Sequence, residues 1–264
     1  MARRYNKYAY IVIFIILLIL CEADRLHGDN GRSFPPYFYY VRCFPLPLIG
    51  LFNTAIRTLT PAPPIFDVNL FPSHSIIKSG WKDIQREALA LYSKKDKLSN
   101  MSFYGPHNNF TGVDTEKGWK TFILKWYQEP AEATTRACPR TSQIIAACPD
   151  VHAAMFSILE PGKRIPEHRG PSTAFLRYHM GLKVPKAPGC YITVDGQRLH
   201  WKEGEAIVFD DTYPHSVQNA TDEPRIILFI DIERPALKGM QPFGPLASFS
   251  RNLNEVSEKQ LPVE

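Results

Sequence analysis

The sequence predicts a mainly β protein with supporting helices, and within that class a double-stranded β-helix, or jelly roll. Two observations lead to this prediction. From residue 153 onward, short β-rich runs alternate with proline and glycine at the spacing typical of sandwiches and barrels. Ahead of them, apolar residues recur at helical intervals, so helices precede the strands and support one side. The predicted strands cover residues 153–159, 174–182, 190–194, 198–201, 206–209, 216–218 and 225–232.

The chain opens with a hydrophobic segment behind a basic head. Arg3, Arg4 and Lys7 precede an apolar run over residues 8–21, which is the pattern of a signal peptide or a signal anchor. The run is shorter than the ~20 residues of an ordinary membrane span, so cleavage after Ala23 is the alternative to an anchor. We interpret residues 1–24 as a single N-terminal membrane anchor.

A segment rich in proline and aromatic residues follows over residues 25–78. Prolines are dense in its central part, residues 33–73, and are expected to prevent a long helix or a central strand there. Two interpretations stay open. The segment lies in the membrane interface, where tyrosine is favoured, or it forms a belt wrapped on the folded domain.

From residue 79 the composition becomes globular, and we assign residues 79–240 to one domain that precedes a polar tail over residues 241–264. Apolar residues from Trp81 to Tyr92 recur at three- and four-residue intervals. This spacing predicts an amphipathic helix over residues 80–95.

Three further local predictions follow from the residue pattern. Residues 118–124 are expected to form a strand, and residues 138–147 a short helix that Pro149 ends. Asp195-Gly196 predicts a two-residue β-hairpin turn between two of the later strands.

Composition limits the classes of function. The chain has 264 residues and a formal net charge of +5, and its basic residues are scattered. No aromatic-interleaved basic stripe is present, so we expect no nucleic-acid partner. The five cysteines include no C-x-x-C pair, which argues against a zinc knuckle or a redox motif. Cys138 and Cys148 could pair in an oxidising compartment, but we favour free thiols around a short helix.

Two histidines and an arginine in the strand-rich part form the pattern of an oxygenase iron site. His168 lies early, His215 lies late, and Arg225 follows ten residues later inside a predicted strand. Neutral imidazoles bind Fe(II), and an arginine pairs with the far carboxylate of a chelating co-substrate. The alternative for each histidine is a hydrogen-bonded structural residue, because spacing alone leaves open whether the three residues meet in space.

Ordered motifs surround these three residues, namely His168-x-Gly170-Pro171, Leu176-Arg177-Tyr178-His179-Met180-Gly181-Leu182, Trp201-x-x-Gly204 and Phe209-Asp210-Asp211. From about residue 119 to 235 the chain resembles the aspartyl/asparaginyl β-hydroxylase domain family of Fe(II)/2-oxoglutarate oxygenases. Within that family it looks nearest to the bacterial lipid A 2-hydroxylase branch. The resemblance implies a jelly-roll fold, Fe(II) as cofactor, and 2-oxoglutarate and O2 as co-substrates.

The resemblance also implies roles for individual residues. His168 and His215 are the expected iron ligands, and Arg225 is expected to hold the distal carboxylate of 2-oxoglutarate through a two-pronged salt bridge. Ser157, eleven residues before His168, is a candidate hydroxyl donor to the same carboxylate.

Three more residues are expected against the co-substrate. Arg177 and His179 share one face of a strand because they are two residues apart, and the resemblance places them with Trp119 in the co-substrate site. Without the resemblance, Arg177 would be a surface cation, His179 a filler of a polar core, and Trp119 an ordinary core residue that is hard to tell from Trp126.

Gly170 is where this chain departs from most enzymes with this chemistry, which carry a carboxylate two residues after the first histidine. The aspartyl/asparaginyl hydroxylase branch is similar in lacking it, whereas the lipid A branch tends to carry aspartate. Asp210 or Asp211 is a candidate acceptor for an imidazole N–H of a metal-bound histidine. The alternative is a turn-forming aspartate pair ahead of His215.

Two substrate classes follow from the resemblance, and both imply hydroxylation of an unactivated C–H bond. A lipid acyl chain is favoured by the N-terminal hydrophobic run, and an aspartyl or asparaginyl side chain of a protein is favoured by Gly170. A third hypothesis is a non-catalytic jelly-roll binding module whose iron site has decayed.

The expected location is at a membrane. The basic head favours a cytosolic N-terminus and an exported domain, but Arg25, Arg32 and Arg42 dilute this bias. Iron and 2-oxoglutarate are easiest to supply in the cytosol, so we favour the cytosolic face, with a lumenal or secreted domain as the alternative. The sequence leaves the oligomeric state open.

Overall fold

The structure is a computed structural model that describes residues 46–93, 118–126, 129–130, 132–170 and 173–238. The predicted anchor over residues 1–24 and the predicted tail over residues 241–264 lie outside the described residues. The part of the chain that is described has no helix long and apolar enough to cross a bilayer.

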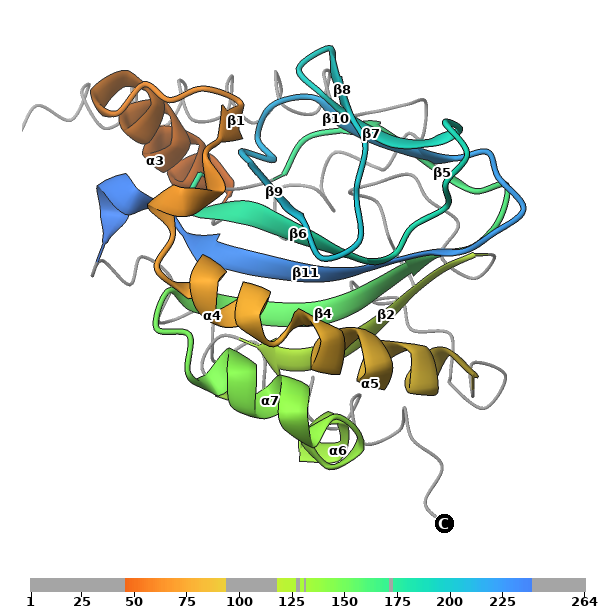
Figure 1. The fold of residues 1–264 in the computed structure, drawn as a ribbon. Helices are drawn as coiled ribbons and strands as arrows, with labels where there is room; N and C mark the ends of the chain where they lie inside the picture. Colours follow the sequence, from red (N-terminus) through yellow and green to blue (C-terminus); the bar gives the residue numbers. More distant parts are fainter. Residues whose placement is uncertain (1–45, 94–117, 127–128, 131, 171–172, 239–264) are drawn as a thin grey trace, which may run out of the picture.

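Within those residues, eleven strands form two antiparallel sheets stacked on each other as a double-stranded β-helix (Figure 1). The larger sheet has the order β1-β9-β6-β11-β4-β2-β3, and the smaller has the order β5-β10-β7-β8. The predicted jelly roll is confirmed, and each of the seven predicted later strands is present with small shifts of its ends. The strands are β1 (Ile65–Phe66), β2 (Trp119–Trp126), β3 (Glu129–Pro130), β4 (Val151–Leu159), β5 (Arg164–His168), β6 (Phe175–Lys183), β7 (Cys190–Val194), β8 (Gln197–Leu199), β9 (Ala206–Phe209), β10 (His215–Asn219) and β11 (Arg225–Glu233).

Helices cover the outer face of the larger sheet (Figure 1). The predicted helix over residues 80–95 is α5, and the predicted short helix after Cys138 is α7, so the expected helical support is confirmed. The helices are α3 (Leu46–Leu59), α4 (Ser73–Ser79), α5 (Trp81–Ser93), α6 (Glu132–Ala137) and α7 (Pro139–Ala146), with short 3-10 turns η1 (Val68–Leu70) and η4 (Pro235–Leu237).

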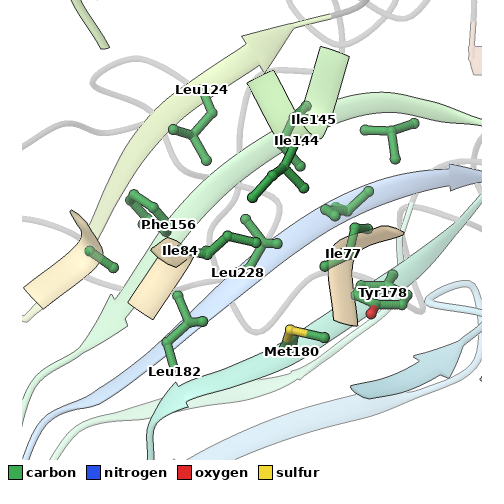
Figure 2. Packing of buried hydrophobic residues seen from close by; sticks show 14 of the residues in the cluster. Ile77, Ile84, Leu124, Ile144, Ile145, Phe156, Tyr178, Met180, Leu182 and Leu228 are labelled. Atoms are coloured by element: carbon green, nitrogen blue, oxygen red, sulfur yellow. The ribbon is translucent and has the colours of Figure 1, made fainter. Parts of the chain in front are cut away.

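The main core lies between these helices and the larger sheet (Figure 2). Ile77 of α4 and Ile84 of α5 pack against side chains of the sheet such as Tyr178 and Leu228, all fully buried. Burying a side chain of this size stabilises the fold by ~1.5–3 kcal/mol. This core therefore holds the larger sheet rigid under the opposite face, which carries polar residues.

Strand alternation separates the two faces of β11. Leu228 and Ile230 point toward the helices, whereas Ile227 and Phe229 join a second core between the two sheets. Arg225 is two residues before Ile227 and therefore points to the same face of β11. A charged residue at the start of this strand is thus directed between the two sheets.

A long helix within residues 33–73 was not expected. The proline density predicted no long helix there, and that prediction is wrong, because α3 runs for 14 residues. Pro47 stands in the first turn of α3, where a missing N–H costs nothing. Phe71 and Ile77 belong to the main core, so the folded unit includes residues on the N-terminal side of position 79.

The predicted hairpin is confirmed between β7 and β8, where Val194 pairs with Gln197. Both turn residues have positive φ, 47° for Asp195 and 75° for Gly196. Positive φ at both central positions is what a tight type I′ turn requires, and aspartate and glycine adopt it readily.

The cysteines of the described part are free. Cys138 and Cys148 are buried thiols, as is Cys190, so the favoured interpretation over a disulfide is confirmed. Burial, together with the charge of Glu87, raises the pKa of the Cys138 thiol to about 12.

Candidate active site

The two predicted iron ligands lie side by side on neighbouring strands of the smaller sheet. His168 at the end of β5 pairs in register with His215 at the start of β10, and their ring centroids are 4.1 Å apart. Nδ1 of His168 is 2.8 Å from the carbonyl oxygen of Pro166, and Nδ1 of His215 is 3.0 Å from that of Tyr213. A carbonyl only accepts, so each Nδ1 carries the proton and each Nε2 keeps its lone pair.

Both imidazoles are held neutral, which is the form that binds a metal. Burial, with the charge of the neighbouring His215, lowers the pKa of His168 to about 4. Burial also lowers the pKa of His215, although the carboxylate of Asp211 opposes this shift. At neutral pH the pair therefore offers two unprotonated nitrogen donors.

Asp211 explains why residue 170 is glycine. The backbone N–H of Gly170 donates to the Asp211 carbonyl at 2.7 Å, and an ideal Cβ on Gly170 would overlap the Asp211 carboxylate. That carboxylate accepts from Nε of Arg177 at 2.8 Å. A side chain at position 170 and the Asp211–Arg177 pair therefore exclude each other.

The two aspartates do not accept the imidazole N–H groups, so that hypothesis is wrong. Backbone carbonyls serve instead. Asp210 forms a turn, accepting from the backbone N–H of Thr212 at 3.0 Å and from its hydroxyl at 2.6 Å. Its other oxygen pairs with Nη2 of Arg234 at 2.5 Å, deep in the protein. The alternative, a turn-forming aspartate, describes Asp210.

A line of rings connects the two histidines to the larger sheet. Phe209 lies 5.5 Å from His215 and 5.0 Å from His179, measured between ring centroids. His179 in turn stacks on Trp201 at 6.2 Å with an interplanar angle of 28°. The residues predicted to bind iron and the residue predicted to contact the co-substrate thus meet in one place.

Beyond that line lies a cluster of buried polar groups without hydrogen-bond partners among the described residues. Arg225 is 1% exposed, and its Cζ sits 5.0 Å from the centre of the Trp201 ring. The atoms left without a partner are Nε and Nη2 of Arg225, both ring nitrogens of His179, and Nε1 of Trp201. Buried polar groups are nearly always hydrogen-bonded, so this cluster fits an anionic small molecule with several acceptor oxygens.

Burial shifts the pKa values of the titratable groups in this cluster. Burial lowers the pKa of Arg225 to about 10, so the guanidinium stays charged at neutral pH. Burial and the nearby charges of Arg225 and Arg177 lower the pKa of His179 well below its usual value. The cluster therefore presents one cation beside neutral donors.

The other predicted co-substrate residues share this inner face but already have partners. Arg177 is paired with Asp211 and with Asp231, so its charge is balanced. The buried hydroxyl of Ser157 accepts from Nε1 of Trp119 at 2.9 Å, which leaves the Ser157 proton able to donate.

Trp201 and Phe209 were not among the predicted site residues. Their motifs, Trp201-x-x-Gly204 and Phe209-Asp210-Asp211, carry part of the family resemblance, and that was the available signal. Neither side chain has a chemical group that points to a role by itself, so their place became apparent only from the packing.

A family model described as "Aspartyl/Asparaginyl beta-hydroxylase" matches residues 78–235, more than half of the chain. The chain belongs to the aspartyl/asparaginyl beta-hydroxylase family. The family predicted from the motifs is therefore confirmed.

Relatives within the aspartyl/asparaginyl beta-hydroxylase family carry two kinds of name. The chain is 37% identical over 174 residues to an ornithine lipid ester-linked acyl 2-hydroxylase of Rhizobium tropici, covering 66% of this chain and 61% of the relative. It is 30% identical over 171 residues to the human aspartyl/asparaginyl beta-hydroxylase, covering 62% of this chain and 21% of the relative. The chain thus spans less than two thirds of either relative.

Among solved structures, a prolyl-4-hydroxylase from Pseudomonas putida aligns with 69% of this chain and 98% of its own length. Its TM-score is 0.41 and its sequence identity is 13%.

Proposed function

We propose that the protein is an Fe(II)- and 2-oxoglutarate-dependent dioxygenase that hydroxylates an unactivated C–H bond of a lipid acyl chain. The observation that carries the proposal is the buried cluster of Arg225, His179 and Trp201, joined by Phe209 to the pair of histidines. One end of this constellation suits a metal, and the other suits the far carboxylate of a keto acid.

The residues present fit iron with two protein ligands. His168 and His215 would hold the ion through Nε2, and no set of three or more histidine, cysteine or acidic residues in the described ranges is arranged to hold a metal. Gly170 supplies no carboxylate, and that of Asp211 is paired with Arg177. Iron bound there would activate O2 while 2-oxoglutarate loses CO2 and becomes succinate, and one oxygen atom would enter the substrate C–H bond.

The protein itself supplies binding and orientation. Arg225 binds the distal carboxylate of 2-oxoglutarate, and the free proton of the Ser157 hydroxyl is available to the same group. His179 and Trp201 add neutral donors. No side chain has to act as a general base, because the reaction needs the C–H bond held near the metal rather than a proton removed by the protein.

The lipid substrate is supported by two observations. One relative is named as a lipid acyl 2-hydroxylase, and the apolar run over residues 8–21 would keep the enzyme at a membrane. The alternative is an aspartyl or asparaginyl side chain in a protein, supported by Gly170 and by the human relative. The membrane location, with the cytosolic face favoured, is part of the same proposal.

The decisive experiment is mass spectrometry of lipids from cells with and without the protein. A gain of one oxygen atom on an acyl chain is expected, and it should vanish in a His168→Ala variant. His200→Ala is the matched control, because His200 is an exposed histidine whose Nδ1 contacts the Cys190 carbonyl, outside the site.

Each other result favours a different hypothesis. Unchanged lipids with 2-oxoglutarate turnover by the purified protein would point to a protein side chain, and hydroxylated aspartate or asparagine would then be sought in peptides. Absence of iron-dependent succinate release would support the non-catalytic binding module.

A further inference from the structure

Helix α3 lies outside the matched residues 78–235, yet it is attached to both segments that flank the histidines. Oδ1 of Asn53 accepts from the backbone N–H of Thr173 at 2.8 Å and from its hydroxyl at 2.9 Å, in the segment after His168. Nη2 of Arg57 donates to the carbonyl of Thr212 at 2.9 Å, in the segment before His215. The end of α3 therefore lies beside the candidate iron site, against the two segments that carry its histidines.

A second arginine converges on the same carbonyl. Nη1 of Arg169, the residue directly after His168, donates to the Thr212 oxygen, also at 2.9 Å. Both arginines are exposed, and their donating nitrogens lie no farther apart than twice that distance. Two like charges this close repel each other, and an anion bound beside them would offset that repulsion.

No acidic side chain of the described residues pairs with either arginine, although acids are close by. Asp211 is paired with Arg177, and Asp210 with Arg234. Each guanidinium has five N–H donors, and the Thr212 carbonyl takes one from each. Among the described residues the remaining donors have no protein acceptor, so the pair is a cationic site that suits an anion from outside.

The surroundings of the pair indicate a lipid as the source of that anion. Arg57 is the one charged residue in the sequence of α3, and Leu59, two residues on, is 77% exposed. Cζ of Arg57 also lies 5.9 Å from the centre of the Tyr213 ring. An exposed cation and an exposed leucine on a mainly apolar helix, with a tyrosine ring beside the cation, are the composition of a segment at a bilayer surface.

We propose that Arg57 and Arg169 bind the anionic headgroup of a membrane lipid while the acyl chain of that lipid enters the site beside His168 and His215. This rests on the proposed lipid acyl hydroxylation and adds the class of headgroup, a phosphate or a carboxylate. Arginine is suited to both groups because its planar fork binds two oxygens at once. The two arginines select the lipid by the charge of its headgroup, and α3 sets how deeply that lipid enters the site.

The test measures binding without turnover. The full chain in neutral detergent is titrated calorimetrically with dihexanoyl phosphatidic acid, dihexanoylglycerol and inorganic phosphate, with no iron, 2-oxoglutarate or O2. The two lipids differ only in the phosphate. We expect the phosphatidic acid to bind at least tenfold more tightly than either of the other two probes. Because no catalysis is involved, failure here is separate from failure of the proposed oxygenase activity.

Variants assign the preference to the two arginines. Arg57→Gln and Arg169→Gln should each weaken binding of phosphatidic acid about tenfold, and the double variant should bind both lipids equally. Arg164→Gln is the matched control, because Arg164 is an exposed arginine at the far end of the strand that carries His168. It should behave as the unaltered protein does.

Three results would overturn the proposal. In the first, the double variant keeps its preference for phosphatidic acid. In the second, inorganic phosphate binds as tightly as the lipid, which would indicate a site for free anions. In the third, the control Arg164→Gln loses as much affinity as Arg57→Gln, which would assign the effect to the overall charge of the protein.

Discussion

Replacing Gly170 with alanine tests the arrangement of the site without any assumption about activity. The added Cβ would overlap the Asp211 carboxylate, which must then move away from Nε of Arg177. Both partners are largely buried, with side-chain exposures of 15% for Arg177 and 5% for Asp211. A charge-assisted hydrogen bond of this kind contributes ~1.5–3 kcal/mol.

The size of the effect follows from what Arg177 retains. Complete loss of a partner from a buried ion pair costs ~3–5 kcal/mol, but Arg177 keeps its second carboxylate, Asp231. We therefore expect Gly170→Ala to lower the free energy of unfolding by about 2–3 kcal/mol. Tryptophan fluorescence during guanidinium unfolding of the full chain in detergent would measure it.

Two further variants make the result specific. Gly189→Ala is the control, because a Cβ there would meet its nearest atoms at 3.5 Å, an ordinary contact, and should change stability by less than about 0.5 kcal/mol. Gly170→Ala combined with Asp211→Ala removes the overlap, so the two losses should not add. Equal stability of the Gly170 and Gly189 variants, or simple additivity in the double variant, would refute the explanation for glycine at position 170.

The other predictions concern the candidate site and a thiol. Arg225→Met should weaken 2-oxoglutarate binding at least about a hundredfold, since a buried charge pair worth ~3–5 kcal/mol is lost. It should not lower the melting temperature of the free protein, because Nε and Nη2 have no partner among the described residues. Calorimetry and thermal melts would check both, and unchanged affinity would remove Arg225 from the co-substrate site. His168→Ala should lose bound iron after anaerobic reconstitution, measured by metal analysis, while His200→Ala keeps it, and equal iron contents would exclude His168 as a ligand. With its pKa raised to about 12, Cys138 is in the thiolate form at pH 8 only to a fraction on the order of 10⁻⁴. Alkylation of native Cys138, followed by peptide mass mapping, should thus be slow and rise about tenfold per pH unit up to about pH 12. Labelling at pH 8 as fast as in the unfolded chain would contradict the burial.

The sequence was sufficient where one physical signal dominated. A continuous apolar run in β11 and helical spacing in α5 predicted both elements, and Asp195-Gly196 predicted the hairpin, because each is a strong local signal.

Strand β5 shows why other elements were missed. Its sequence, Arg164-Ile-Pro-Glu-His168, has a proline in the middle and a single buried apolar residue, Ile165. Proline is tolerated because β5 is the edge strand of the smaller sheet, and the register with β10 is irregular between His215 and Val217. Edge position is a property of the assembled sheet, so the sequence of the strand alone does not contain it.

The candidate site was predictable as a set of residues but not as a set of contacts. His168 and His215 were expected together, and their register and ring contact confirm that they are neighbours. That Arg177 would be neutralised by Asp211 and Asp231 depends on three separate segments meeting, which spacing along the chain does not specify.

The two sheets divide the chemistry between them. Both histidines stand on the smaller sheet, while Arg225 and His179 stand on the larger one, whose opposite face is fixed by the helices. The separation between the two histidines and Arg225 is therefore set by the thickness of the apolar layer between the sheets, where Ile192 and Ile227 pack. A change of side-chain volume in that layer, far from any reacting atom, would alter the distance between the histidine pair and Arg225. The affinity for iron would stay constant, while the fit of 2-oxoglutarate between the histidine pair and Arg225 would change.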